Sequence, residues 1–154
     1  TPIFVRLGRR NVHPSGARAE LKDCVIENVT CRSTASFIAS SITGVPGLRV
    51  QDLTLRNLDL TVKGGCTAAE AKRPVPEVEK AYPENRMFAK LPLPAYGFYL
   101  RHADGIRFEN VKLRFAGLRE EREPVVQDDC TGVEFVNCDF LVPSKTLFVN
   151  QRSN

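Results

Sequence analysis

One nine-residue pattern occurs three times in the chain, and this repeat restricts the fold more than any other feature. Each copy starts with a glycine and continues with apolar residues at alternate positions around a central Asn or Asp. The copies are GLRVQDLTL at 47–55, GIRFENVKL at 105–113 and GVEFVNCDF at 132–140. Strict alternation predicts β-strand, because successive side chains of a strand point to opposite faces.

A longer form of the pattern predicts where the strands bend. It occurs as AELKDCVIENVTC and LRVQDLTLRNLDL, which match Asp23 with Asp52 and Asn28 with Asn57, both 29 residues apart. Asn and Asp tolerate left-handed backbone angles, so inside a strand pattern they are typical of bends. Asn110 lies 58 residues after Asp52, which is two such periods, and we assign it to the same bend.

The repeat length indicates a β-solenoid. A strand–bend–strand unit of 27 to 29 residues is too short for a βαβ unit, but it suits one coil whose equivalent residues stack on the next. We therefore expect an all-β fold of about five coils, with PIFVRLG at 2–8 as the first strand and TLFVNQ at 146–151 as the last. A β-sandwich also alternates strands and turns, but it has no reason to keep Asp or Asn at a fixed period.

Residues 63–95 interrupt the repeat. Five prolines and the absence of alternation predict a long loop inserted into a single domain that spans residues 1–154, with a short helix starting at Pro76. Two roles remain open for this loop. It carries function, as long loops on rigid scaffolds often do, or it caps the side of the solenoid.

Composition limits the partners and cofactors. The net charge is +4, and no basic run alternates with aromatic residues, so we expect no nucleic-acid partner. The apolar runs are too short to cross a membrane. Five cysteines without a C-x-x-C pair and only two histidines indicate neither a metal site nor a cofactor, and the cysteines are interpreted as buried free thiols.

Four stretches of the chain resemble a known family. They are PIFVRLGRRN, SSITGVPGLRVQDLTLRNLDL, VPEVEKAYPENRMFAKLPLPAYGFYLRHADGIRFENVKL and EREPVVQDDCTGVEFVNCDF. Together they are similar to the C-terminal part of bacterial glycoside hydrolases of family 28, the polygalacturonase family. The resemblance implies a right-handed parallel β-helix, no cofactor or metal, and a secreted or periplasmic protein. It also implies inverting hydrolysis of galacturonan or rhamnogalacturonan, with one carboxylic acid protonating the leaving oxygen and one carboxylate activating water.

The catalytic motifs of that family are matched only in part. The family places its carboxylates in an N-x-D motif and a following G-D-D or Q-D-D motif, which makes Asp104, Asp128 and Asp129 candidates here. His102 stands where the first motif has Asn, and no G-H-G or R-x-K follows. We therefore expect the catalytic carboxylates to lie N-terminal to Thr1, in a longer enzyme, and the chain alone to be inactive.

Alignment of the repeats on their glycines brings four polar residues together. Arg101 falls beside Asp128, and His102 falls beside Asp129. These contacts are either ion pairs between coils or a polar patch that meets uronate sugars.

Four residues are the expected substrate-binding set, namely Tyr96, Tyr99, Arg101 and His102. Aromatic rings stack on sugars, and Arg pairs with carboxylates. The expected partners are a pectic polysaccharide or oligosaccharide and, at the open N-terminal edge, either preceding coils or a second copy. Two alternatives remain: a carbohydrate-binding solenoid without catalysis, and a structural or assembly solenoid.

Overall fold

The computed structural model describes residues 1–10, 15–16, 18–32, 38–84, 86–88, 92–117 and 119–143. Within these residues the regular secondary structure is almost entirely β-strand, with one short helix. The elements in chain order are β1 (Phe4–Arg6), β2 (Cys24–Cys31), β3 (Ser40–Thr43), β4 (Val50–Val62), α1 (Ala68–Ala71), β5 (Ala95–Phe115), β6 (Glu123–Thr131), β7 (Glu134–Val136) and β8 (Asp139–Phe140).

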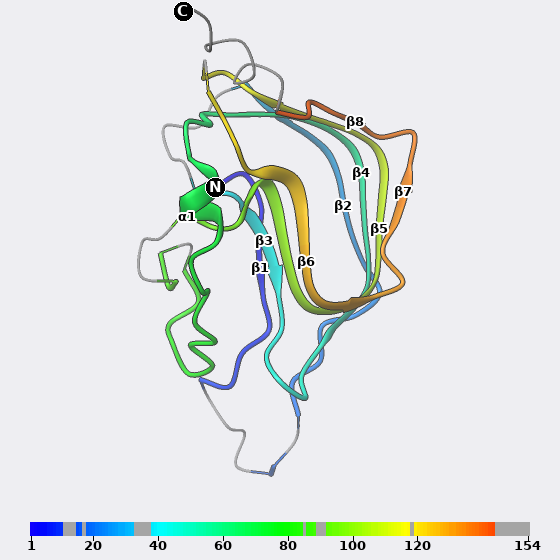
Figure 1. Ribbon diagram of the computed structural model, residues 1–154. Coiled ribbons are helices and arrows are strands. Elements are labelled where there is room, and N and C mark those ends of the chain that lie inside the picture. Colours follow the sequence, from blue (N-terminus) through cyan, green and yellow to red (C-terminus); the bar gives the residue numbers. More distant parts are fainter. Residues whose placement is uncertain are drawn as a thin grey trace, which may run out of the picture.

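Every pairing between these strands is parallel, and the strands form one curled sheet (Figure 1). The long strand β5 organises it. Its first part lies between β3 and β6, and its later part lies between β4 and the strands β7 and β8. β1 continues the sheet beyond β3, and β2 continues it beyond β4. The expected all-β architecture with parallel strands is confirmed, and β1 matches the expected first strand.

Bends with left-handed backbone angles curl the long strands. Residues with positive φ include Asp52 and Asn57 in β4, and His102 and Asn110 in β5. Side chains stack at one of these bends, where Nδ2 of Asn57 donates to Oδ1 of Asn28 at 3.1 Å and Nδ2 of Asn110 donates to Oδ1 of Asn57 at 2.8 Å. The expected bends at Asn and Asp are confirmed, and the amides form a ladder across three passes of the chain.

The pairing register corrects one part of the sequence interpretation. Asn110 lies against Asn57, 53 residues away, and not in the register of Asp52, which faces Gly105. The 53 residues from Asn57 to Asn110 form one pass that contains the long loop, so the 58-residue spacing from Asp52 does not span two coils. An inserted turn before β4 also misaligns the first copy of the nine-residue pattern. Thr43 pairs with Arg101 and Val50 pairs with Ala103, so residues 44–49 all lie opposite the single residue between that pair. This insertion is a tight turn. Its Gly47 occupies the same position in the nine-residue pattern as Gly105, but the two glycines do not pair in the sheet.

The main core lies inside the curl of the sheet. Apolar side chains from all the long strand segments meet there, and they line up from one strand to the next. Ile26, Leu55, Phe108 and Phe135 form one such row, in which the rings of Phe108 and Phe135 stack with centroids 5.2 Å apart. At the two ends of the rows the side chains are only partly covered, and Phe135 remains 43% exposed.

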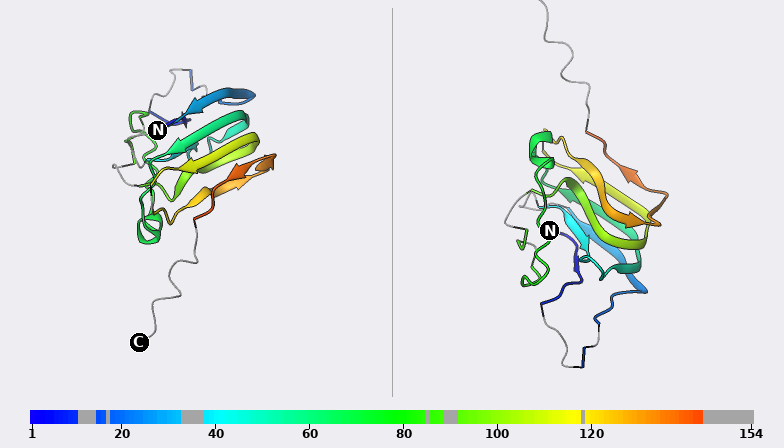
Figure 2. Two further views of the ribbon diagram at one scale, coloured as in Figure 1. Left: turned by 90° about the horizontal axis from the view of Figure 1, so that it is seen from above. Right: turned by 60° about the horizontal axis from the view of Figure 1, so that its bottom comes forward.

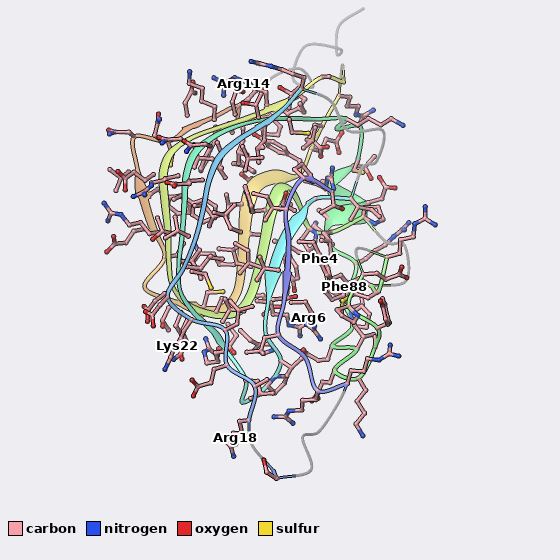
Figure 3. All side chains as sticks on the ribbon, turned by 180° about the vertical axis from the view of Figure 1, so that it is seen from behind. Phe4, Arg6, Arg18, Lys22, Phe88 and Arg114 are labelled. Atoms are coloured by element: carbon pink, nitrogen blue, oxygen red, sulfur yellow. The ribbon has the colours of Figure 1, made fainter. Side chains whose placement is uncertain are left out.

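The long loop covers the outside of the sheet where β1, β3, β5 and β6 run side by side (Figures 1 and 2). A second apolar cluster fills the space between loop and sheet, and Phe88 of the loop lies beside Phe4 of β1 in it (Figure 3). This contact pattern favours the capping role for the loop. The helix expected at Pro76 is wrong. Instead α1 starts after Thr67, whose side chain and Glu70 form a reciprocal capping box.

Three smaller expectations can be compared with the structure. All five cysteines are free, but only Cys66 is fully buried, and the other four are half-buried. No helix in the described ranges is long and apolar enough to cross a bilayer. The strand expected at 146–151 lies outside the described residues.

Candidate functional site

Six of the seven predicted site residues gather where β5 and β6 bend. Arg101 pairs in register with Asp128, and His102 lies beside Asp129, as the alignment on the repeat glycines predicted. Asp104, two residues further along β5, and Tyr99, before the bend, complete the group. We call this group, together with Arg49 and Glu77, the bend cluster.

Arg101 is held by three groups from different parts of the chain. Its Nη1 donates to the carbonyl of Val75 at 2.8 Å, and its Nη2 pairs with the carboxylate of Glu77. Its Nε lies 3.1 Å from Oδ2 of Asp128, close enough for an ion pair. The Nε–H bond does not point at that oxygen, so within the described residues this buried nitrogen makes no hydrogen bond. The contact with Asp128 is therefore electrostatic.

His102 lies between two carboxylates. Its Nδ1 is 2.6 Å from Oδ2 of Asp129, and its Nε2 is 3.1 Å from Oε1 of Glu77. The residue has a φ of 48°, and its side chain is only 10% exposed. The imidazole thus connects β6 with the long loop, and a protonated ring would satisfy both carboxylates at once.

Arg49 joins the two carboxylates on the other side of the bend. Its Nη2 donates to Oδ1 of Asp104 at 2.9 Å, and its Nη1 donates to Oδ2 of Asp129 at 2.6 Å. Thr131 also donates its hydroxyl to Asp104, at 2.6 Å. The hydrogen bonds from Arg49 lower the pKa of Asp104, and the hydrogen bond from His102, followed by that from Arg49, lowers the pKa of Asp129.

The two predicted tyrosines lie on opposite faces of the sheet, because they are three residues apart in one strand. The Tyr99 ring packs under the long loop, and its hydroxyl donates to Oδ2 of Asp128 at 2.8 Å. The Tyr96 ring lies in the main core, with its hydroxyl 2.7 Å from the carbonyl of Leu141. Each ring is 1% exposed. Neither ring presents a face for stacking, and the substrate-binding role expected for them stays a prediction.

The four carboxylates of the bend cluster contact two guanidinium groups and one imidazole. Asp104 and Asp129 have lowered pKa values, so both stay ionised near neutral pH. A general acid in inverting hydrolysis must instead hold a proton at working pH. Asp104 and Asp129 are therefore suited to binding cations and to joining strands, and poorly suited to protonating a leaving group.

Sequence reasoning missed Glu77 and Arg49, although both are central to the bend cluster. Arg49 belongs to the inserted turn, and Glu77 belongs to the long loop. Glu77 lies outside the repeat. Arg49 lies in the copy at 47–55, but that copy is out of register with the copy at 105–113, so aligning the copies could not place Arg49 beside Asp104 and Asp129.

The described residues contain no group of three or more His, Cys, Asp or Glu side chains arranged to hold a metal ion. Comparison of the chain with protein-family models, with curated proteins and with solved structures gave no match in any of the three.

Proposed function

We propose that the chain forms stacked coils of a right-handed parallel β-helix and is the C-terminal portion of a pectin-degrading glycoside hydrolase. In this proposal the protein cleaves galacturonan- or rhamnogalacturonan-type bonds with inversion, and its catalytic carboxylates lie outside the 154 residues. The protein is secreted or periplasmic and uses no cofactor.

The observation that carries the proposal is the stacking of equivalent residues across successive passes of the chain. Asn28, Asn57 and Asn110 bond in a row at one bend, and all the strand pairs are parallel. This arrangement is what a β-helix requires, because each coil must repeat the bends of the coil below it. The resemblance of the sequence to family 28 supports the choice of substrate.

The contacts of the bend cluster favour catalytic carboxylates that lie outside the 154 residues. Arg49 and His102 bond Asp104 and Asp129, so these two carboxylates act as links between coils. The exposed half of Asp128 stays available to solvent.

The direct test measures reducing ends released from polygalacturonate and from rhamnogalacturonan. We expect the 154-residue chain to release no reducing ends. We expect the protein isolated from its natural source to release them with inversion, which NMR of the anomeric proton detects. Hydrolysis by the 154-residue chain would overturn the placement of the carboxylates and make Asp104, Asp128 and Asp129 catalytic candidates. Absence of cleavage of either polymer by the natural protein would overturn the proposed activity.

A second candidate function is assembly through the ends of the sheet. The last layer, residues 123–143, contains five acidic residues and no Lys or Arg. Its carboxylates are well exposed, for example Glu134 and Asp139 at 61% each. The first layer, residues 1–32, contains five Arg, one Lys and three acidic residues. Within the described residues β2 pairs with a strand on one side only, and Val25 is 55% exposed. Opposite charges and open edges favour head-to-tail contact between copies.

Sedimentation at low and high salt tests this second candidate. Association through these ends predicts oligomers that dissociate as salt rises, because exposed charge pairs are screened. A monomer at all salt concentrations and at high protein concentration would exclude it.

A further inference from the structure

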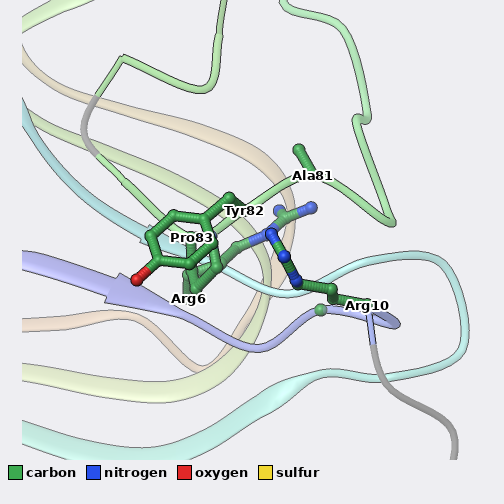
Figure 4. Close-up of a pocket in the computed structure, with 6 residues that line it drawn as sticks. Arg6, Arg10, Ala81, Tyr82 and Pro83 are labelled. Atoms are coloured by element: carbon green, nitrogen blue, oxygen red, sulfur yellow. The ribbon is translucent and has the colours of Figure 1, made fainter.

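A hollow of about 350 Å³ lies between the end of β1 and the long loop, away from the bend cluster. Its lining combines two arginines with a tyrosine, a proline and two small residues (Figure 4): Arg6, Gly8, Arg10, Ala81, Tyr82 and Pro83. Its size is at the lower end of the range for small-ligand pockets, about 300 to 1,000 Å³.

Arg10 and Tyr82 form the open side of the hollow. The guanidinium carbon of Arg10 lies 4.6 Å from the centre of the Tyr82 ring, so the cation stacks on the aromatic face. Stacking leaves the N–H groups at the guanidinium edge directed outward in its plane, where they can bond a carboxylate with two parallel hydrogen bonds. Tyr82 is 65% exposed, which is unusual for a large aromatic residue and leaves much of the ring accessible.

The neighbouring arginines are already engaged. Arg6 donates from Nη1 to the carbonyl of Gly44 at 2.7 Å and from Nη2 to the carbonyl of Glu77 at 2.8 Å. Arg9 pairs with Glu79 at 3.3 Å. In the described part of the chain, neither Arg6 nor Arg10 forms an ion pair with a carboxylate, but Arg6 is bonded to backbone carbonyls there. Among the described residues the hollow thus presents two guanidinium groups without a paired carboxylate, and that of Arg10 lies beside an exposed aromatic ring.

We propose that this hollow binds the carboxylate-bearing ring of a sugar acid. Arg10 holds the carboxylate, and Tyr82 with Pro83 supports the apolar face of the pyranose ring. The inference deepens the proposed function and rests on it for the choice of galacturonate as the sugar acid.

Calorimetric titration of the chain with three trisaccharides tests the inference. The probes are trigalacturonate, an alginate trimer of guluronate, and neutral galactotriose. The variants are Tyr82→Ala, Tyr82→Phe and Arg10→Gln. Arg73→Gln is the control, because Arg73 is an exposed arginine of the long loop that also contains Tyr82. Unchanged thermal unfolding of each variant establishes that its fold is intact.

We expect trigalacturonate to bind and galactotriose not to bind. Arg10→Gln is expected to weaken binding about tenfold or more, as for loss of a hydrogen bond to a charged group. Tyr82→Ala is expected to have a similar effect, and Tyr82→Phe and Arg73→Gln little effect. Binding that survives both Arg10→Gln and Tyr82→Ala would overturn the pocket and leave the proposed function standing.

The alginate trimer tests the sugar-acid pocket independently of the pectic substrate. If it binds through Arg10 and Tyr82 while trigalacturonate does not, the sugar-acid pocket stands and the pectic substrate is wrong. If neither acidic trimer binds, the pocket is overturned, and the reducing-end assay on the natural protein still decides the proposed activity independently.

Discussion

Glu120 and Arg122 form an ion pair that is completely removed from solvent. Both side chains are 0% exposed, and the carboxylate accepts from Nε and from Nη2 of Arg122, at 2.8 Å in each case. The same carboxylate accepts from the backbone nitrogen of Arg122 at 2.9 Å, and Nη1 of Arg122 donates to the carbonyl of Leu93 at 3.2 Å. The pair therefore ties the end of the long loop to the start of β6.

Replacing Glu120 with Gln is expected to destabilise the protein by about 3 to 5 kcal/mol, because it leaves the Arg122 guanidinium buried without a counter-charge. Urea unfolding followed by circular dichroism measures the effect. Glu134→Gln is the matched control, since it breaks an exposed pair with Arg107 and should cost about 1 kcal/mol or less. Equal losses in the two variants would show that burial does not determine the strength of the Glu120–Arg122 pair.

A second prediction concerns the amide ladder. Asn57 has a φ of 54°, donates to Asn28 and accepts from Asn110. Asn57→Ala removes both hydrogen bonds and also places a Cβ-bearing residue without local hydrogen bonding in the left-handed region, which costs about 1 to 2 kcal/mol. Asn57→Gly removes the same bonds without that steric cost. We expect both variants to be less stable than the parent, with Ala below Gly in the urea midpoint. The reverse order would mean that backbone strain is not what selects Asn at this bend.

Much of the regular part of the fold could be read from the sequence, because the bends repeat with the strands. Arg101 was placed opposite Asp128 from the spacing of two glycines alone. The irregular segments could not be read this way. The long loop lies between Asp52 and Asn110, and its length gives these residues a spacing of two apparent periods although β4 and β5 are adjacent passes of the chain. The pairing of Asn57 with Asn110 reveals the true register. The inserted turn at 44–49 could not be recognised either, because its Gly47 fits the nine-residue pattern. Arg49, which belongs to this turn, was therefore missed.

Acid sensitivity follows from the contacts of Arg49. Its hydrogen bonds help to hold the pKa of Asp104 and Asp129 below their ordinary values. A carboxyl whose pKa is lowered by folding stabilises the protein above its unfolded pKa, about 3.9 for Asp, and this stabilisation is lost as the pH falls through the lower, folded value. We therefore expect the urea midpoint to fall between about pH 5 and pH 2.

Arg49→Gln should reduce this acid-dependent loss, because the variant has less carboxylate pairing to lose. Arg56→Gln, which removes an exposed pair with Glu27, serves as the control and should keep more of the parent's pH dependence. Parallel pH profiles for the parent and Arg49→Gln would contradict the role given to Arg49.

The turn that carries Arg49 depends on a close approach of backbone atoms at Gly44. A Cβ at this position would lie 2.3 Å from the carbonyl oxygen of Leu48 and 2.6 Å from that of His102. Both obstacles are backbone, so neither can move aside as a side chain would, and Gly44→Ala is expected to cost about 3 kcal/mol.

Gly47→Ala is the matched variant in the same turn. It introduces a residue at a φ of 76°, but its nearest obstacle is the flexible side chain of Arg9, so it should cost about 1 to 2 kcal/mol. Because a shifted turn also moves Arg49 away from Asp104 and Asp129, Gly44→Ala should lose part of the acid dependence that Gly47→Ala retains. Equal stability of the two alanine variants, with unchanged pH profiles, would show that the turn can relax without disturbing the bend cluster.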